Sequence, residues 1–203
     1  MKTNLLTLAL VFSVAAWVRA ADEEGFRPLF NGKDTTGWHL RNADGHNSWK
    51  VEGGLLKNTV NQGEHGTDLV TDQKFQNFTV KYEYRVPNDS NSGFYLRGRY
   101  EIQILGDYTK GQPARTGNGS LYNFKAPDKF VSKPGSEWQS VEATIIGNKI
   151  TVIQNGVKIH DNVEVTKGTG GELDNKYDQP GPIFLQGDHG TVSFRNIRIK
   201  ELK

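Results

Sequence analysis

The sequence has no cysteine, almost no excess of charge and only one long apolar run. Without cysteine the fold has no disulfides, and thiol catalysis and thiolate metal sites are excluded. The 25 basic residues nearly balance the 23 acidic ones, so the chain lacks the excess of positive charge that is typical of proteins that bind nucleic acid or an anionic membrane. Runs of about ten residues or more with a helical period are also missing. These absences favour a β protein that is held together by its core alone.

The one long apolar run lies at the N-terminus. Lys2 provides a short basic start, and residues 5–17 are apolar but too few to span a bilayer comfortably. Val18-Arg19-Ala20 then supplies the small residues of a cleavage site before Ala21. The pattern predicts a signal peptide over residues 1–20 and a single domain over residues 21–203. We therefore expect a secreted or periplasmic protein with no membrane association after cleavage. Removal of Lys2 and Arg19 with the signal peptide would lower the formal net charge from +2 to zero.

Abundant glycine and frequent turn signals predict that the rest of the chain is all-β. Gly147-Asn148 and Asn155-Gly156 each predict a two-residue hairpin turn. The hydrophobic pattern changes parity after Phe194, which predicts a bulge near Arg195-Asn196. Many short strands with frequent turns are typical of a sandwich or a barrel. The candidate strands are Trp49–Glu52, Leu55–Asn58, Asp68–Val70, Phe78–Val86, Phe94–Leu105, Gly119–Asn123, Trp138–Ile146, Lys149–Gln154, Val157–His160, Gly181–Gln186 and Thr191–Lys200.

Residues 94–104 form the most informative stretch, because their period-two pattern predicts one long half-buried strand. One face would carry Phe94, Leu96, Tyr100, Ile102 and Ile104, and the other Tyr95, Arg97, Arg99, Glu101 and Gln103. The second face could grip a polyhydroxylated ligand and supply a base. The alternative is an exposed strand on which Glu101 pairs with Arg97 or Arg99, since antiparallel sheets commonly keep one polar face.

Three further segments concentrate polar groups that strands do not need: Asn91-Ser92-Gly93, residues 117–122 and residues 185–190. In the last segment, His189 either belongs to a site or caps a turn. The polar loops 106–118 and 167–180 are long enough to serve a binding site. No Gly-x-Ser-x-Gly elbow, phosphate loop or His-Glu-x-x-His pair occurs. A mixed His/Glu/Asp site for a divalent cation stays open, because such sites leave no regular spacing.

Several short motifs, in order over residues 25–203, resemble those of a known family. They are residues 26–32 with Gly37-Trp38, residues 49–54, residues 78–84, Asn91-Ser92-Gly93 with Arg97, residues 100–104, Leu185-Gln186-x-x-His189-Gly190 and residues 194–197. In order and spacing the chain resembles the 3-keto-disaccharide hydrolase domain family. The resemblance implies a concanavalin A-like jelly-roll sandwich of two antiparallel sheets. It also implies an exported bacterial enzyme that cleaves glycosides whose glucosyl C3 is a ketone.

The implied chemistry needs no pair of carboxylates around the scissile bond. A ketone at C3 acidifies the hydrogen on C2, so a general base can start a β-elimination that expels the aglycone from C1. Water then adds to the enone and completes net hydrolysis. The site therefore needs a base, a group that stabilises the enolate oxygen and an acid near the leaving group.

The catalytic candidates are Glu101, His189 and Arg97. Glu101 or His189 would be the base, and a cation or Arg97 would stabilise the enolate. If a divalent cation is bound, Glu101 and His189 are its expected ligands and another group is the base. The substrate-binding candidates are Asn91, Gln103, Gln186, Tyr122 and Arg99, with the amides of Gln103 and Gln186 holding hydroxyl groups because each offers both a donor and an acceptor.

Two other functions stay open at this level. The sheet could be a non-catalytic, lectin-like carbohydrate-binding module, or the protein could be a conventional glycosidase that acts on unoxidised sugar. Glu101 among arginine and glutamine favours catalysis, because lectin sites rely more on aromatic platforms and amides. In every case the expected partner is a carbohydrate, and we expect a monomer or a weak oligomer.

Overall fold

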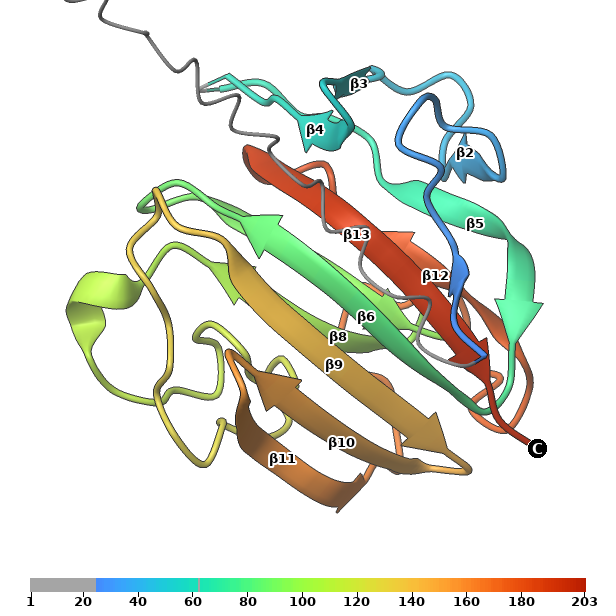
Figure 1. The fold of residues 1–203 in the computed structure, drawn as a ribbon, viewed down its shortest axis with the longest axis vertical. Coiled ribbons are helices and arrows are strands. Elements are labelled where there is room, and N and C mark those ends of the chain that lie inside the picture. Colours follow the sequence, from blue (N-terminus) through green and yellow to red (C-terminus); the bar gives the residue numbers. More distant parts are fainter. Residues whose placement is uncertain (1–24, 62) are drawn as a thin grey trace, which may run out of the picture.

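The computed structural model describes residues 25–61 and 63–203, which form two β-sheets packed face to face (Figure 1). The signal peptide predicted over residues 1–20 lies outside the described residues. Within them, the only regular element that is not a strand is a short 3-10 helix, η1 (Tyr108–Lys110). No helix in the same part of the chain is long and apolar enough to cross a membrane. The all-β prediction is confirmed.

Both sheets are antiparallel throughout, as the predicted sandwich requires. The larger sheet has the order β11-β10-β9-β6-β13-β4-β3, with β1 also paired to β13. Its strands are β1 (Arg27–Pro28), β3 (Trp49–Glu52), β4 (Leu55–Asn58), β6 (Phe78–Arg85), β9 (Gln139–Ile146), β10 (Lys149–Gln154), β11 (Val157–Glu164) and β13 (Val192–Glu201). The smaller sheet, β2-β5-β12-β7-β8, consists of β2 (Trp38–Leu40), β5 (Leu69–Phe75), β12 (Gly181–Leu185), β7 (Asn91–Leu96) and β8 (Tyr100–Leu105).

The turns predicted in the larger sheet are present. Gly147-Asn148 joins β9 to β10, and Asn155-Gly156 joins β10 to β11. Asn155 and Gly156 both have positive φ, 52° and 78°, which is the backbone that a two-residue hairpin turn of this type needs. The predicted bulge in β13 is confirmed as well, because the pairing with β6 shifts register between Arg195 and Arg198.

Two strand predictions are wrong. Residues 94–105 form a hairpin rather than one strand, because Arg97 and Gly98 have φ of 52° and 66° and reverse the chain between β7 and β8. Outside the turn residues 97–99 the predicted faces survive this change, since Tyr95 pairs with Glu101 and residues of equal parity in β7 and β8 still share a face. The predicted strand Gly119–Asn123 is reduced to isolated bridges from Leu121.

The main core lies between the two sheets, where Tyr82 of β6 stacks on Phe94 of β7 with 3.9 Å between ring centroids. In Figure 1 the strands β6 and β13 overlie β8 and β12 of the smaller sheet. A second, much smaller apolar cluster of Val70, Tyr95 and Phe184 belongs to the opposite face of the smaller sheet. That outer face also carries Glu101, so the smaller sheet separates the main core from the polar candidates.

Candidate active site

A pocket of about 220 Å³ lies on the outer face of the smaller sheet. Strands β7 and β8, the turn after β12 and the loop 167–180 contribute to it, although they are far apart in sequence. Tyr95 and Phe184 form its apolar part, stacked with 4.0 Å between ring centroids. The pocket is lined by Arg41, Asp68, Asn91, Tyr95, Glu101, Gln103, Tyr122, Gly170, Gly171, Phe184, Gln186, Asp188 and His189.

Six of the eight residues predicted for the site line this one pocket: Glu101, His189, Asn91, Gln103, Gln186 and Tyr122. They come from all three polar segments singled out in the sequence. Of the two long loops, the 167–180 loop reaches the pocket through Gly170 and Gly171, whereas the 106–118 loop contributes no lining residue.

Arg97 and Arg99 do not line the pocket, which corrects the roles predicted for both. Arg97 donates from Nε to the carbonyl of Gln76 at 2.6 Å. Arg99 donates from Nε to Asp174 Oδ1 at 2.5 Å and from Nη1 to the carbonyl of Gln179 at 2.8 Å. Both arginines are buried in the turn of the β7–β8 hairpin, so their side chains fasten neighbouring loops instead of facing the pocket.

Glu101 is the most strongly perturbed acid in the pocket. Glu101 is only 2% exposed, and burial raises the pKa of its carboxyl group to about 7. The hydrogen bond from the Tyr95 hydroxyl to Glu101 Oε2, at 2.8 Å, opposes this rise in pKa. Gly93 stands beside it on β7, where a Cβ would lie 2.3 Å from Glu101 Oε1. A side chain at position 93 would therefore displace this carboxyl group from its present position. A carboxyl with this pKa can both accept and return a proton near neutral pH.

Tyr95 keeps Glu101 hydrogen-bonded in either protonation state. The Tyr95 hydroxyl lies 2.8 Å from Glu101 Oε2 and 3.0 Å from the carbonyl of Gly170. Because a phenol has one proton to donate, it serves the carboxylate when Glu101 is ionised. When Glu101 is protonated, the carboxyl can donate to Tyr95 and the phenol can donate to Gly170.

His189 pairs with its neighbour in the chain. Its Nδ1 lies 2.5 Å from Asp188 Oδ1, and this hydrogen bond raises the pKa of the His189 imidazole, with only partial opposition from burial. The Asp188 contact engages Nδ1, and no hydrogen bond of Nε2 to the described protein residues is present. The imidazole is thus a half-exposed group that favours its protonated form, which suits a proton donor.

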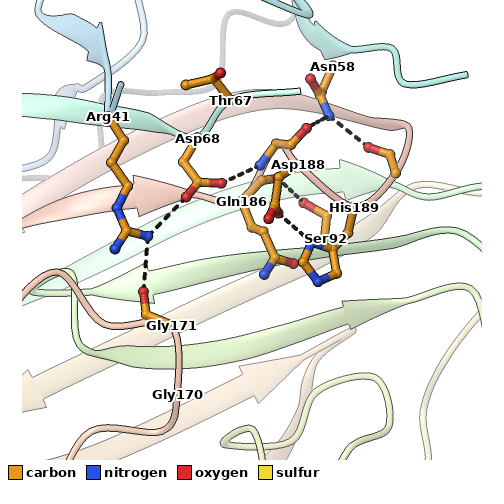
Figure 2. Close-up of polar contacts among 12 residues, drawn as sticks. Arg41, Asn58, Thr67, Asp68, Ser92, Gly170, Gly171, Gln186, Asp188 and His189 are labelled. Atoms are coloured by element: carbon orange, nitrogen blue, oxygen red, sulfur yellow. Dashed lines mark hydrogen bonds and ion pairs between the residues drawn. The ribbon is translucent and has the colours of Figure 1, made fainter. Parts of the chain in front are cut away.

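The turn that carries Asp188 and His189 is anchored by buried polar groups (Figure 2). Asn58 donates from Nδ2 to the carbonyl of Gly187 at 2.9 Å and to that of Gly190 at 2.7 Å. Asp68 Oδ1 accepts a hydrogen bond from the amide of Gly187 at 3.0 Å. The turn therefore has a defined position although His189 itself is half exposed.

Replacing Asn58 with alanine is expected to reduce the free energy of unfolding by about 2–4 kcal/mol, because two buried carbonyls and the Ser48 hydroxyl lose their partner. Urea unfolding measures this loss. The control is Asn148→Ala, which should change stability by less than about 0.5 kcal/mol, because the exposed Asn148 side chain bonds to no described residue except Glu164, at Oε1. Equal stability of the two variants would contradict the anchoring role.

Within residues 25–61 and 63–203, Arg41 is the only residue that brings a guanidinium group to the pocket lining. Its Nη1 lies 3.2 Å from Asp68 Oδ2 and 3.2 Å from the carbonyl of Gly171, so it also ties the 167–180 loop to the sheet (Figure 2). Sequence reasoning missed Arg41 and Asp68, and no motif marks either of them. It also left Asp188 unassigned, although that residue directly precedes His189.

Two amide oxygens in the pocket lack donors. Asn91 Oδ1 and Gln186 Oε1 are buried without any hydrogen-bond partner among the described residues. A buried acceptor left unpaired costs about 1–3 kcal/mol, so a ligand that supplies donors would recover this energy. A ligand whose hydroxyl groups reach the two oxygens would satisfy both of them.

Glu101 and His189 share the pocket, as the predicted cation site requires. However, no group of three or more His, Cys, Asp or Glu side chains within residues 25–61 and 63–203 is arranged to hold a metal ion. The two predicted ligands therefore have no third His, Cys, Asp or Glu side chain among the described residues that is placed to complete a metal site with them.

These features define the class of protein, which is a jelly-roll β-sandwich with a polar pocket on the outer face of its smaller sheet. Residues 25–200 match the model of the 3-keto-alpha-glucoside-1,2-lyase-like domain, and the chain belongs to this family. It is 29% identical over 239 aligned positions to a 3-keto-disaccharide hydrolase of Bacteroides thetaiotaomicron, covering 89% of this chain and 80% of that protein. The predicted family and fold are confirmed.

Solved structures support the same fold. The crystal structure of a "putative glycosyl hydrolase" from Parabacteroides distasonis has a TM-score of 0.71 at 28% identity, covering 88% of this chain and 84% of that one. A β-glucanase of Bacillus licheniformis has a TM-score of 0.53 at 13% identity, covering 88% and 97% of the two chains, and shares the fold alone.

Proposed function

We propose that this protein hydrolyses glycosides whose glucosyl unit carries a ketone at C3, by elimination followed by hydration. The family and the relative named as a 3-keto-disaccharide hydrolase support carbohydrate hydrolysis. The observation that carries the proposal is the presence of Glu101, with a pKa near 7, and the Asp188-bound His189 in one pocket. One group is suited to take a proton and the other to give one.

Elimination begins with Glu101. Its carboxylate removes the proton from C2, and the C2–H electron pair forms the enolate with the C3 carbonyl. The Arg41 guanidinium, which takes the role predicted for Arg97, stabilises the negative charge on the enolate oxygen. Asn91 Oδ1 and Gln186 Oε1, the two acceptors without protein donors, receive substrate hydroxyl groups.

His189 completes the reaction. As the enolate collapses to the C1=C2 enone, the C1–O bond breaks and the protonated imidazole donates its proton to the leaving oxygen. Water then adds to C1 while His189 takes one of its protons, and Glu101 returns the first proton to C2. One water molecule is consumed, the 3-keto sugar and the alcohol are released, and both side chains regain their starting protonation states.

The proposal is tested with a 3-keto-glucoside that bears a chromogenic aglycone, beside its unoxidised parent, with and without a chelator. Release from the keto substrate alone, unchanged by the chelator, is the expected result. Release from the unoxidised parent would identify a conventional glycosidase instead. Sugar binding without release from either compound would identify a carbohydrate-binding module.

Replacing Tyr95 with phenylalanine is expected to shift the acidic limb of the pH–kcat profile to higher pH. The Tyr95 hydroxyl favours the ionised form of Glu101, so its loss raises the pKa of that carboxyl further above 7. The ring and its stacking on Phe184 are retained. An acidic limb that does not move, or that moves to lower pH, would contradict Glu101 as the base.

We further propose that the protein acts outside the cytoplasm after removal of residues 1–20. Expression in a bacterial host with an intact export system is expected to yield a mature protein that begins at Ala21. Intact mass measurement of the exported fraction checks this. A full-length mass in the cytoplasmic fraction alone would contradict export.

A further inference from the structure

A second cleft, of about 570 Å³, adjoins the active-site pocket. It is formed by residues 60–61 and 63–65, the turn at residues 87–90 and the turn at residues 188–191. Asp188 and His189 line both cavities. The group that donates a proton in the proposed mechanism therefore lies at the boundary between a small pocket and a larger cleft.

The cleft is polar, and several of its side chains are available to a ligand. His65, Asn88 and Asp89 are exposed, and the side chains of His65 and Asp89 make no hydrogen bond to other described residues. His65 also lies close enough to Asp188 to lower the pKa of that carboxyl, which places it near the boundary. No Phe, Tyr or Trp side chain is among the described residues that line the cleft.

This lining matches one kind of leaving group better than another. An aromatic aglycone would find no ring on which to stack. A sugar would find carboxylate and imidazole groups that hydrogen-bond to its hydroxyls. In the proposed mechanism the ketone-bearing ring lies beside Glu101 and its C1 oxygen lies next to His189, so the leaving group would extend into the adjoining cleft.

We propose that this cleft is the leaving-group subsite, that it takes a sugar and that His65 and Asp89 bind its hydroxyl groups. The assignment rests on the proposed function, because it uses the position of His189 next to the bond that breaks. Specificity for 3-keto-disaccharides over 3-keto-glucosides with small aglycones then comes from binding in the cleft. Its volume, larger than that of the pocket, also admits leaving groups longer than one sugar.

The test compares kcat/KM for a 3-keto-glucosyl disaccharide and for methyl 3-keto-glucoside, which is too short to reach the cleft. His65→Ala is expected to lower the disaccharide-to-methyl ratio by about tenfold, as loss of a hydrogen bond to an ionisable group does. Asp89→Asn is expected to lower it by a smaller factor, because the amide oxygen still accepts a hydrogen bond but carries no charge. Asparagine suits position 89, where φ is 62°. The matched control is His39→Ala, an exposed histidine on β2 outside both cavities, which should leave the ratio unchanged.

The outcomes separate the two proposals. If the parent protein turns over both substrates and neither variant changes the ratio, the cleft assignment is overturned and the proposed function stands. If both variants lower kcat/KM equally for the two substrates, the cleft assignment is also overturned, because the methyl glycoside does not reach it. If the parent turns over neither substrate, the proposed function fails and the cleft assignment fails with it.

Discussion

Replacing Glu101 with glutamine is expected to lower kcat on a 3-keto-glucoside by about 10²–10⁴-fold, the range that a general base contributes. Glutamine keeps the size of the side chain and an oxygen that accepts from Tyr95, so the pocket should remain intact. Steady-state kinetics with the chromogenic substrate measure the loss. The double variant Glu101→Gln, Gln103→Glu is an informative companion, because it restores a carboxyl group to the pocket but at position 103 instead of position 101. Full activity of Glu101→Gln would exclude Glu101 as the base.

The same variant is expected to be more stable than the parent at alkaline pH. The pKa of Glu101 rises from 4.5 to about 7 on folding, so its contribution to stability is complete below pH 4.5 and is lost as the pH rises through 7. The loss is on the order of 3 kcal/mol for this buried group. Glutamine has no charge to bury, so its advantage in urea unfolding should be absent near pH 4 and full near pH 9. An inactive variant that is also less stable at both pH values would indicate a structural role instead.

Replacing His189 with alanine should have an effect that depends on the leaving group. A sugar alcohol needs a proton as it departs, so its release should slow by about 10²–10⁴-fold. A nitrophenolate departs without protonation, so its release should slow by less than about tenfold in the elimination step. Measuring kcat for both substrates in the parent and in the variant gives the ratio that isolates proton donation.

His39→Ala is the matched control for this experiment. His39 also pairs with an aspartate, with Nδ1 2.6 Å from Asp72 Oδ1, and is similarly exposed, but it lies outside the pocket. Neither substrate should be affected by its loss. An equal slowing of both substrates in His189→Ala would indicate that the imidazole binds or positions the sugar and does not protonate the leaving oxygen.

The β7–β8 hairpin shows what the alternation of apolar and polar residues can predict. It placed Tyr95, Glu101 and Gln103 correctly on one face of the sheet, even though the prediction of a single strand was wrong. The reason is that the turn spans three residues, so residues of equal parity still share a face after the chain reverses. Arg97 and Arg99 were misplaced because the same alternation does not distinguish a strand from a turn with positive φ at residues 97 and 98.

The polar segments around Asn91, Tyr122 and His189 were also recognisable, because strands do not need such groups. Sequence did not show that they meet, and it missed Arg41 and Asp68 entirely. Arg41 bonds to Asp68 and to the carbonyl of Gly171, 130 residues away. Such a contact depends on the order of strands in the sheet, which leaves no periodic signal in the chain.

The sequence by itself determined the β class, the hairpin turns, the bulge in β13 and the residue types available for acid–base chemistry. Steric limits on turns and the two-residue period of strands act over a few neighbours, so they can be read locally. Only the tertiary structure decided that Glu101 is buried deeply enough to hold a proton near pH 7 and that Arg41, not Arg97, enters the pocket. Burial and charge proximity arise from packing between distant segments, and they exist only once the two sheets are assembled.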